Sequence, residues 1–453
     1  MRKLLFSSRK NDTAPRKALR GDAYTRLFRG AAVERAWWKS LRPSGQHVVR
    51  AAALGGLRPG WVLTKLSAAA VLGAQIKTCP SEITCAAAPG KGRAFTELPG
   101  VRAGLLPPHA KVVRQAVAVE AGAEVAVLCT SPACTMFDVA ASCPLDESLV
   151  VINSLLAKAS ADAARSEALK KEADMLKGLH PIVDASKLAR QESFDYLRMS
   201  AAEVEAEAGR LMRENGRALR AGGRQFCRQG ARRDELAAGT AAALLGAKSF
   251  RAFRSQVDRY RQHGLNTKTA AGLYEECLAL VWKNRRRFGV RRALLALLFA
   301  TDQCESAAES LSCARFFELG FSQPTLQVEF LAADSGRAVY RVDGAWDLRE
   351  TPRGKARGPF PDAVVLGAPA PPASKQALLF EFDGAAKYRD PEMLRGRDRG
   401  DVLAAQIRRE ADLREKGYEI VRVIWGDLNP PAGLARKLSR FDIPRLRLRK
   451  RKR

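Results

Sequence analysis

The chain has 453 residues, 46% of them hydrophobic, which is enough for two or three domains with apolar cores. Lysine and arginine outnumber aspartate and glutamate by 77 to 48, giving a formal net charge of +29. This charge favours nucleic acid as the partner, with an anionic membrane surface or a merely solubilising surface as alternatives. No run reaches the roughly 18 apolar residues of a membrane helix, so a membrane-spanning protein is excluded.

Cysteine and histidine usage excludes further classes. The nine cysteines form no CxxC pair and no Cys/His spacing typical of a zinc site. We therefore expect reduced thiols in a cytoplasmic protein, since the apolar run in residues 1–10 is too short for a signal peptide. None of the four histidines lies beyond His263, which excludes nuclease mechanisms that use a local C-terminal histidine base.

The N-terminal third alternates between polar and apolar stretches. Residues 1–18 are polar and basic, and we expect a flexible arm. Residues 61–76, WVLTKLSAAAVLGAQI, predict a buried helix whose alanines and Ser67 allow close packing. Short apolar runs between Pro/Gly turns predict strands over 80–130. Residues 130–157 predict a turn and two helices, with Thr130 or Ser131 as the first N-cap.

Residues 158–283 are rich in Ala, Glu, Lys and Arg and predict a helical region. Six arginines recur there at three- and four-residue steps, which places them on one helical face. A solvated helix face is the preferred interpretation, and a phosphate-facing stripe is the alternative. These arginines are Arg210, Arg213, Arg217, Arg220, Arg224 and Arg228.

From residue 301 the pattern predicts a mixed sheet flanked by helices. An amphipathic helix is followed by a hairpin, a long Pro/Gly-rich loop (350–376), a third strand, a helix and a fourth strand. A strand–helix–strand order predicts a right-handed crossover between parallel strands. The helices are expected at 305–321 and 401–417, and the strands at 325–331, 336–346, 376–382 and 418–425.

The third of these strands carries the most informative residues. Glu381 and Asp383 are two positions apart, so both should project to one face of the strand, with Phe380 and Phe382 on the other. Neighbouring carboxylates repel one another unless a cation lies between them, and a divalent metal ion is the usual cation. Lys387 follows within reach. The simpler interpretation is an edge strand with a solvated acidic face.

Acids at the ends of successive strands are typical of metal-dependent phosphodiesterases. Asp343 ends the second strand, and Glu381 and Asp383 end the third. Such acids hold Mg²⁺ or Mn²⁺, which polarises the phosphate and acidifies a bound water, and a nearby lysine stabilises the transition state. Glu309 on the preceding helix and Glu410 on the following helix complete the candidate set.

Six blocks, in order, resemble the C-terminal domain of actinobacterial AbiEi-type antitoxins, which are type IV toxin–antitoxin proteins. That domain is similar to very-short-patch-repair (Vsr-like) endonucleases of the PD-(D/E)XK superfamily. Residues 19–27, 63–76 and 130–140 resemble the family's N-terminal and middle regions. The six blocks are RRFGVRRALLALLFA (286–300), ESAAES (305–310), ELGFSQPTLQVE (318–329), RVDGAW (341–346), EFDGAAKY (381–388) and RREADLREKGYEIVRVIWGDL (408–428).

The resemblance implies a restriction-endonuclease-like fold for the last domain and a DNA substrate. It implies Asp343, Glu381 and Asp383 as metal ligands, with Glu309 assisting and Glu410 as the helix carboxylate. The family's Glu-x-Lys lysine position is Asp383, so the lysine role is assigned to Lys387. The residues expected to contact DNA are Arg341, Arg408, Arg409, Arg449, Lys450 and Arg451.

The expected architecture is an α+β or α/β multidomain protein. It combines a small mixed N-terminal domain, a helical middle region and the C-terminal mixed sheet. The expected segments are an arm (1–18), the AbiEi-like N-terminal and middle domain (19–157), a helical insertion (158–283), the endonuclease-like domain (284–438) and a basic tail (439–453).

Three functions remain open at this point. One is a Mg²⁺-dependent DNA endonuclease, and another is a non-catalytic DNA-binding antitoxin that regulates a cognate toxin. The third is an RNA-binding module, which the low aromatic content disfavours. Convergence of Asp343 and Glu381, with Lys387 pointing toward them, would favour hydrolysis. Pairing of the acids with arginines would favour the regulator.

Overall fold

The computed structural model describes residues 4–6, 22–87, 98–106, 109–120, 123–178, 240–331, 339–347, 377–383, 399–415, 417–441 and 443. The chain divides into two compact units, each with helices and a mixed sheet. The first unit contains mainly residues 1–161 and 237–314, and the second contains mainly 162–236 and 315–449. No described helix is long and apolar enough to span a membrane.

The first unit begins with a small antiparallel sheet in the order β1-β3-β2. The expected N-terminal arm therefore starts as a strand, because Leu4–Phe6 pairs with Ala31–Val33, and the rest of the arm, 7–18, lies outside the described residues. The elements are β1 (Leu4–Phe6), β2 (Tyr24–Phe28), β3 (Ala31–Glu34), α2 (Arg35–Ser40) and α3 (Pro43–Leu57).

A five-stranded mixed sheet in the order β6-β5-β4-β8-β7 follows. The strands expected over 80–130 are confirmed, but the helix expected over 61–76 is confirmed only over Lys65–Val71 and is wrong at both ends. At its N-terminal end Trp61–Leu63 forms a central strand, because its apolar residues pair with both β5 and β8. The elements are β4 (Trp61–Leu63), α4 (Lys65–Val71), β5 (Ile83–Ala87), β6 (Val101–Gly104), β7 (Val112–Glu120) and β8 (Ala123–Thr130).

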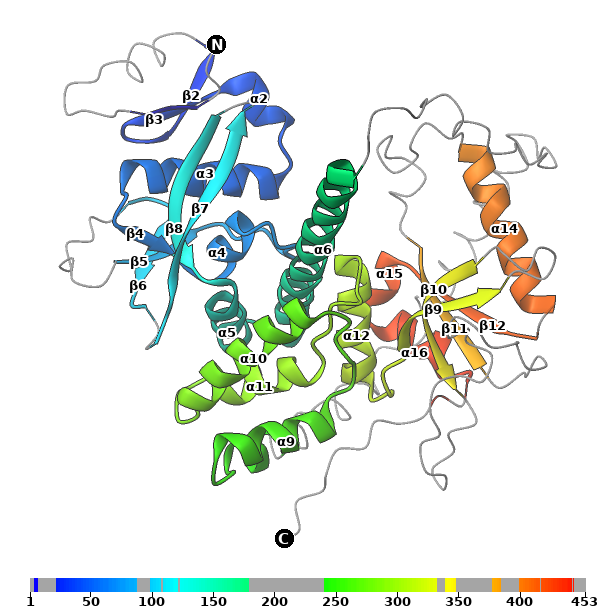
Figure 1. Ribbon diagram of the computed structural model, residues 1–453. Coiled ribbons are helices and arrows are strands. Elements are labelled where there is room, and N and C mark those ends of the chain that lie inside the picture. Colours follow the sequence, from blue (N-terminus) through cyan, green and yellow to red (C-terminus); the bar gives the residue numbers. More distant parts are fainter. Residues whose placement is uncertain are drawn as a thin grey trace. The chain divides into compact units, whose positions relative to one another are not determined.

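Helices complete the first unit (Figure 1). The expected cap is confirmed, since the Ser131 side chain accepts a hydrogen bond from the Cys134 N–H and Pro132 begins the helix. Most of the predicted helical insertion, including the arginine stripe 210–228, lies outside the described residues. The described helices are α5 (Pro132–Ser142), α6 (Leu145–Gly178, which belongs to this unit as far as Ala161), α9 (Phe250–Tyr260), α10 (Lys268–Lys283) and α11 (Val290–Leu298).

Helix α11 belongs to this first unit, whereas the expected endonuclease-like domain begins before it at residue 284. Its apolar side chains Ala293, Leu294 and Leu297 are buried, and the helix packs against α5. The division between the units instead falls after Ala314, within α12 (Ala307–Leu319). The eight cysteines among the described residues are all free.

The second unit contains a four-stranded sheet in the order β12-β11-β10-β9. Strands β9, β10 and β11 are antiparallel, whereas β11 and β12 are parallel and joined through α14. This order of elements confirms the expected mixed sheet with a crossover. The elements are β9 (Thr325–Leu331), β10 (Val339–Asp347), β11 (Ala377–Phe382), α14 (Arg399–Glu415), β12 (Glu419–Val423), α15 (Trp425–Leu428) and α16 (Ala432–Leu438).

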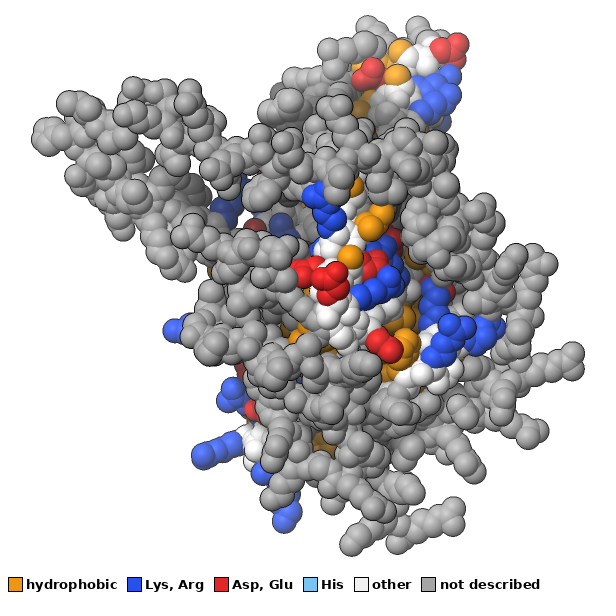
Figure 2. Space-filling model, turned by 90° about the vertical axis from the view of Figure 1, so that its right-hand side faces the viewer, with side chains coloured by type: hydrophobic (Ala, Val, Ile, Leu, Met, Phe, Trp, Pro, Cys, Tyr) orange, Lys and Arg blue, Asp and Glu red, His pale blue; other side chains and the backbone are white. Residues whose placement is uncertain are grey.

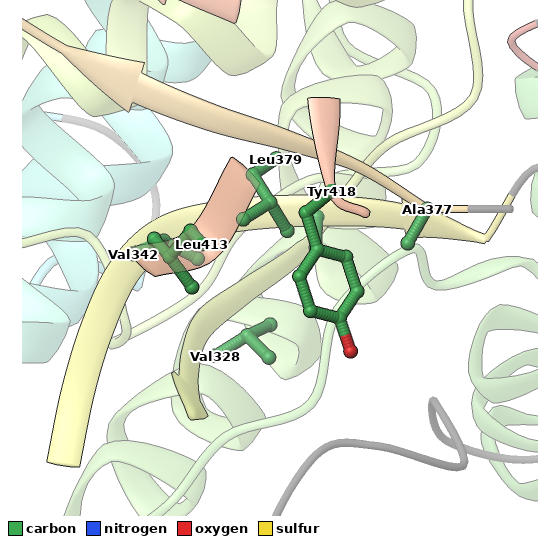
Figure 3. Close-up of a cluster of buried hydrophobic side chains, with 7 residues drawn as sticks. Val328, Val342, Ala377, Leu379, Leu413 and Tyr418 are labelled. Carbon is green, nitrogen blue, oxygen red and sulfur yellow. The ribbon is translucent and has the colours of Figure 1, made fainter. Parts of the chain in front are cut away.

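Strand β11 is central and buried on both faces, which rules out the solvated edge strand. On one face Phe380 packs edge-on against Phe316 of α12, with ring centroids 5.1 Å apart. On the other face, Leu379 belongs to a cluster that includes Leu413 of α14 and Tyr418 (Figure 3). Helices thus cover both sides of the strand that carries Glu381.

A buried histidine joins three elements of the first unit. His47 of α3 is 2% exposed, and its Nε2 lies 3.0 Å from the Ser67 hydroxyl of α4. The same hydroxyl accepts a hydrogen bond from the Thr84 N–H of β5. Burial, assisted by the charge of Arg50, lowers the pKa of His47 from 6.5 to about 4.

We expect His47→Gln to reduce the acid sensitivity of the first unit. The unfolded chain protonates this histidine before the folded chain does, so its stability contribution is lost as the pH falls from 6.5 toward 4. Urea unfolding at pH 7 and at pH 4 measures how far the free energy of unfolding falls between the two. This fall should be about 2–3 kcal/mol smaller in the variant than in the wild type. The exposed His109→Gln serves as control, and equal acid sensitivity of His47→Gln and the wild type would contradict the prediction.

Candidate functional site

Strands β10 and β11 separate where the candidate acids lie. Their antiparallel pairing runs from Asp347↔Ala377 to Gly344↔Phe380 and ends there. The next opposed positions along the two strands are Asp343 and Glu381. Strand β11 nevertheless continues to pair with β12 as far as Phe382↔Val423. The opening is therefore confined to the side of β11 on which Asp343 lies.

The Asp343 carboxylate fills this opening. Its Oδ2 accepts a hydrogen bond of 2.7 Å from the Phe382 N–H, the donor directly after Glu381. A distortion lies on the other side as well: the β9 pairing passes from Val342↔Val328 to Gly344↔Leu326, and the intervening Gln327 has a φ of 51°. Such irregularities are frequent beside functional sites. The hydrogen bond from the Phe382 N–H thus fixes the Asp343 carboxylate beside the strand that carries Glu381.

Glu381 is held by an arginine. Its side chain is 8% exposed, and its Oε1 forms an ion pair with the guanidinium of Arg409 from α14. Arg409 also donates a hydrogen bond of 3.2 Å to the Arg341 carbonyl of β10. A buried carboxylate is costly unless it is paired, so Arg409 supplies the charge that the interior lacks.

A second ion-pair network lies at the end of β11. Arg422 of β12 contacts Asp383 at 3.4 Å and also pairs with Glu410 of α14. Glu410 in turn lies 2.5 Å from Arg414, whose side chain is 63% exposed. Among the described residues in Figure 2, acidic and basic side chains accordingly lie next to one another. Both acids of the Glu381-x-Asp383 motif therefore have arginine partners.

Asp343 and Glu381 offer the hard oxygen donors that Mg²⁺ prefers. An Mg²⁺ site needs one or two protein carboxylates, with water and phosphate oxygens supplying the rest. Two carboxylates from neighbouring strands fit this requirement, because the Phe382 N–H orients Asp343 through only one of its two oxygens. A group of three or more His, Cys, Asp or Glu side chains suited to a metal is absent among the described residues.

Glu309 has a structural role at the start of a helix. It forms a reciprocal cap at the start of α12: its Oε1 accepts from the Ser306 hydroxyl at 2.7 Å, and its Oε2 accepts from the Glu305 N–H at 2.9 Å. The Glu309 N–H donates back to the Ser306 hydroxyl. Its carboxylate thus stabilises the helix terminus, and its assisting role in catalysis stays a prediction.

The expected basic residues differ in their contacts and exposure. Arg409 is engaged with Glu381, so its side chain is an internal counter-ion, whereas Arg341 and Arg408 are exposed. Arg422 was missed from the sequence; the signal was a positively charged residue in the middle of the mostly apolar strand YEIVRVIW. Four expected site residues lie outside the described residues: Lys387, Arg449, Lys450 and Arg451.

Comparison of the chain with family models, curated proteins and solved structures finds no match. The resemblance to AbiEi-type antitoxins and Vsr-like endonucleases therefore stays a prediction.

We expect Arg409→Met to destabilise the second unit by about 3–5 kcal/mol, because it removes the arginine that forms an ion pair with the buried Glu381. Native-state hydrogen exchange of the β11 amides measures this effect in that unit. Adding Glu381→Gln should restore much of the loss. Arg414→Met is the matched control: its exposed pair should cost less than about 1 kcal/mol. Equal costs for the two arginines would contradict the interpretation.

Proposed function

We propose that the second unit is a restriction-endonuclease-like module that binds DNA and hydrolyses a phosphodiester bond with Mg²⁺ or Mn²⁺. The observation that carries the proposal is the separation of β10 and β11 at Asp343 and Glu381. A mixed sheet in the order β12-β11-β10-β9, with a helical crossover between its parallel strands, supports it. The net charge of +29 favours a polyanionic substrate.

In this proposal Asp343 and Glu381 hold the metal ion. When bound, the ion would polarise the phosphate and lower the pKa of a water molecule. The protein's own contribution is to position the acids. The Phe382 N–H fixes the Asp343 carboxylate, and Arg409 forms an ion pair with Glu381 inside the unit. Lys387 keeps its predicted role of stabilising the transition state.

A second candidate function is a non-catalytic DNA-binding regulator, the antitoxin of a toxin–antitoxin pair. The pairing of Glu381 with Arg409 and of Asp383 with Arg422 favours it, because both carboxylates are already neutralised by the chain. In that case the acids stabilise the unit, and the basic surface alone carries the function. For either function we propose a cytoplasmic location, in keeping with the scattered free cysteines.

Plasmid nicking distinguishes the two functions. We expect the purified chain to nick or cut supercoiled DNA with Mg²⁺ or Mn²⁺ and to lose this activity in EDTA. Asp343→Asn with Glu381→Gln should lower the rate at least about 100-fold, because it removes both charged ligands while preserving their shape. Glu419→Gln, an exposed acid on β12, is the matched control and should cleave as the wild type does.

Equal cleavage by the double variant and the wild type would overturn the assignment of the two acids. DNA binding without cleavage in either metal ion would support the regulator instead.

A further inference from the structure

A strongly basic turn joins α10 to α11 in the first unit, whereas Asp343 and Glu381 belong to the second. Residues 283–292 read KNRRRFGVRR and contain no acidic residue. Phe288 lies at the centre of the turn and is 95% exposed. Six cationic side chains, all exposed, flank it in sequence: Lys283, Arg285, Arg286, Arg287, Arg291 and Arg292.

The backbone of this turn is fixed rather than loose. The Arg287 N–H donates to the Asn284 carbonyl at 2.8 Å, and Asn284 caps the end of α10. Gly289 has a φ of 84°, and a Cβ there would lie 2.2 Å from the Ala141 carbonyl of α5. Only glycine permits this approach. The contact with α5 therefore holds the turn in place and presents Phe288 outward.

Some of the cations have partial partners within the unit. Arg285 stacks on the Trp282 ring at 4.5 Å. Burial raises the pKa of Asp138 on α5 to about 6, and the charges of Lys65 and Arg287 oppose this rise. Arg286, Arg291 and Arg292 thus remain the exposed arginines best placed to meet an external anion.

We propose that residues 283–292 form a DNA-docking surface, in which the arginines contact backbone phosphates and Phe288 packs against the bases. The choice of DNA rests on the proposed function but does not require cleavage. Guanidinium groups match phosphate oxygens in pairs, which suits an arginine-rich surface to a phosphodiester backbone. An inserted or stacked aromatic side chain is a recurrent companion of such contacts.

A lipid surface fits this turn less well. Interfacial membrane binding uses a broad apolar face along an amphipathic helix. Here one aromatic ring stands among charged neighbours, while the apolar side chains of α11 are buried against the unit. A single exposed aromatic is ordinary on a protein surface, and what distinguishes Phe288 is its place in a fixed turn with a dense positive charge.

The test uses the full chain in EDTA, so that binding is measured without cleavage. Fluorescence anisotropy with a labelled DNA duplex is recorded across a range of salt concentrations. The variant Arg286→Gln/Arg291→Gln/Arg292→Gln should weaken binding about 10–100-fold and lower the slope of log affinity against log salt by about 3. Its matched control removes three exposed arginines elsewhere in the same unit: Arg26→Gln/Arg58→Gln/Arg114→Gln.

Phe288 gives an independent readout. Phe288→Ala should weaken binding about 10-fold without changing the salt slope, and Phe288→Trp should retain binding, because a ring contact is not electrostatic. Equal losses in the two triple variants, or no effect of Phe288→Ala, would overturn the proposal. So would a Phe288→Ala variant that loses binding to anionic phospholipid vesicles but keeps DNA binding.

Failure here is distinguishable from failure of the proposed function. If the wild type binds DNA and the triple variant binds equally well, only the docking surface is overturned. If the wild type binds through this turn but never nicks DNA, the docking surface stands and hydrolysis falls.

Discussion

The second unit depends on how a carboxylate is accommodated in a strand that is buried on both faces. Phe380 and Leu379 pack into opposite layers, and the next residue, Glu381, carries a charge into the same interior. Arg409 of α14 supplies the compensating positive charge. It also donates a hydrogen bond to the Arg341 carbonyl of β10, so the same guanidinium contacts both strands. The charge compensation thus links helix, central strand and neighbouring strand, so the site and the fold are stabilised by the same contact.

This compensation is compatible with both candidate functions. An arginine can neutralise an acid permanently, or it can hold the acid ionised for a metal ion and its phosphate. Both cases place Arg409 against Glu381 and the Phe382 N–H against Asp343. The two functions differ in the free energy of exchanging the guanidinium of Arg409 for a metal ion beside Glu381.

Much of the second unit could be predicted from the sequence. Alternation and crossover order located its helices and strands, because periodicity responds to burial on faces of an element. The partners of the acids could not be predicted in this way: Arg409 and Arg422 meet Glu381 and Asp383 only through tertiary packing. The strand at Trp61–Leu63 was missed for a related reason, since a fully buried strand and a buried helix share the same apolar composition.

Helix α12 is shared between the two units, with residues up to Ala314 counted in the first and those from Arg315 in the second. Its N-terminal cap, Ser306 with Glu309, therefore belongs to one unit, while Phe316, which packs on the β11 core, belongs to the other. A recombinant fragment cut at the boundary would begin in mid-helix and lose the cap. The same restriction applies to domain exchange during evolution: a second unit transferred to another protein must include the whole of α12.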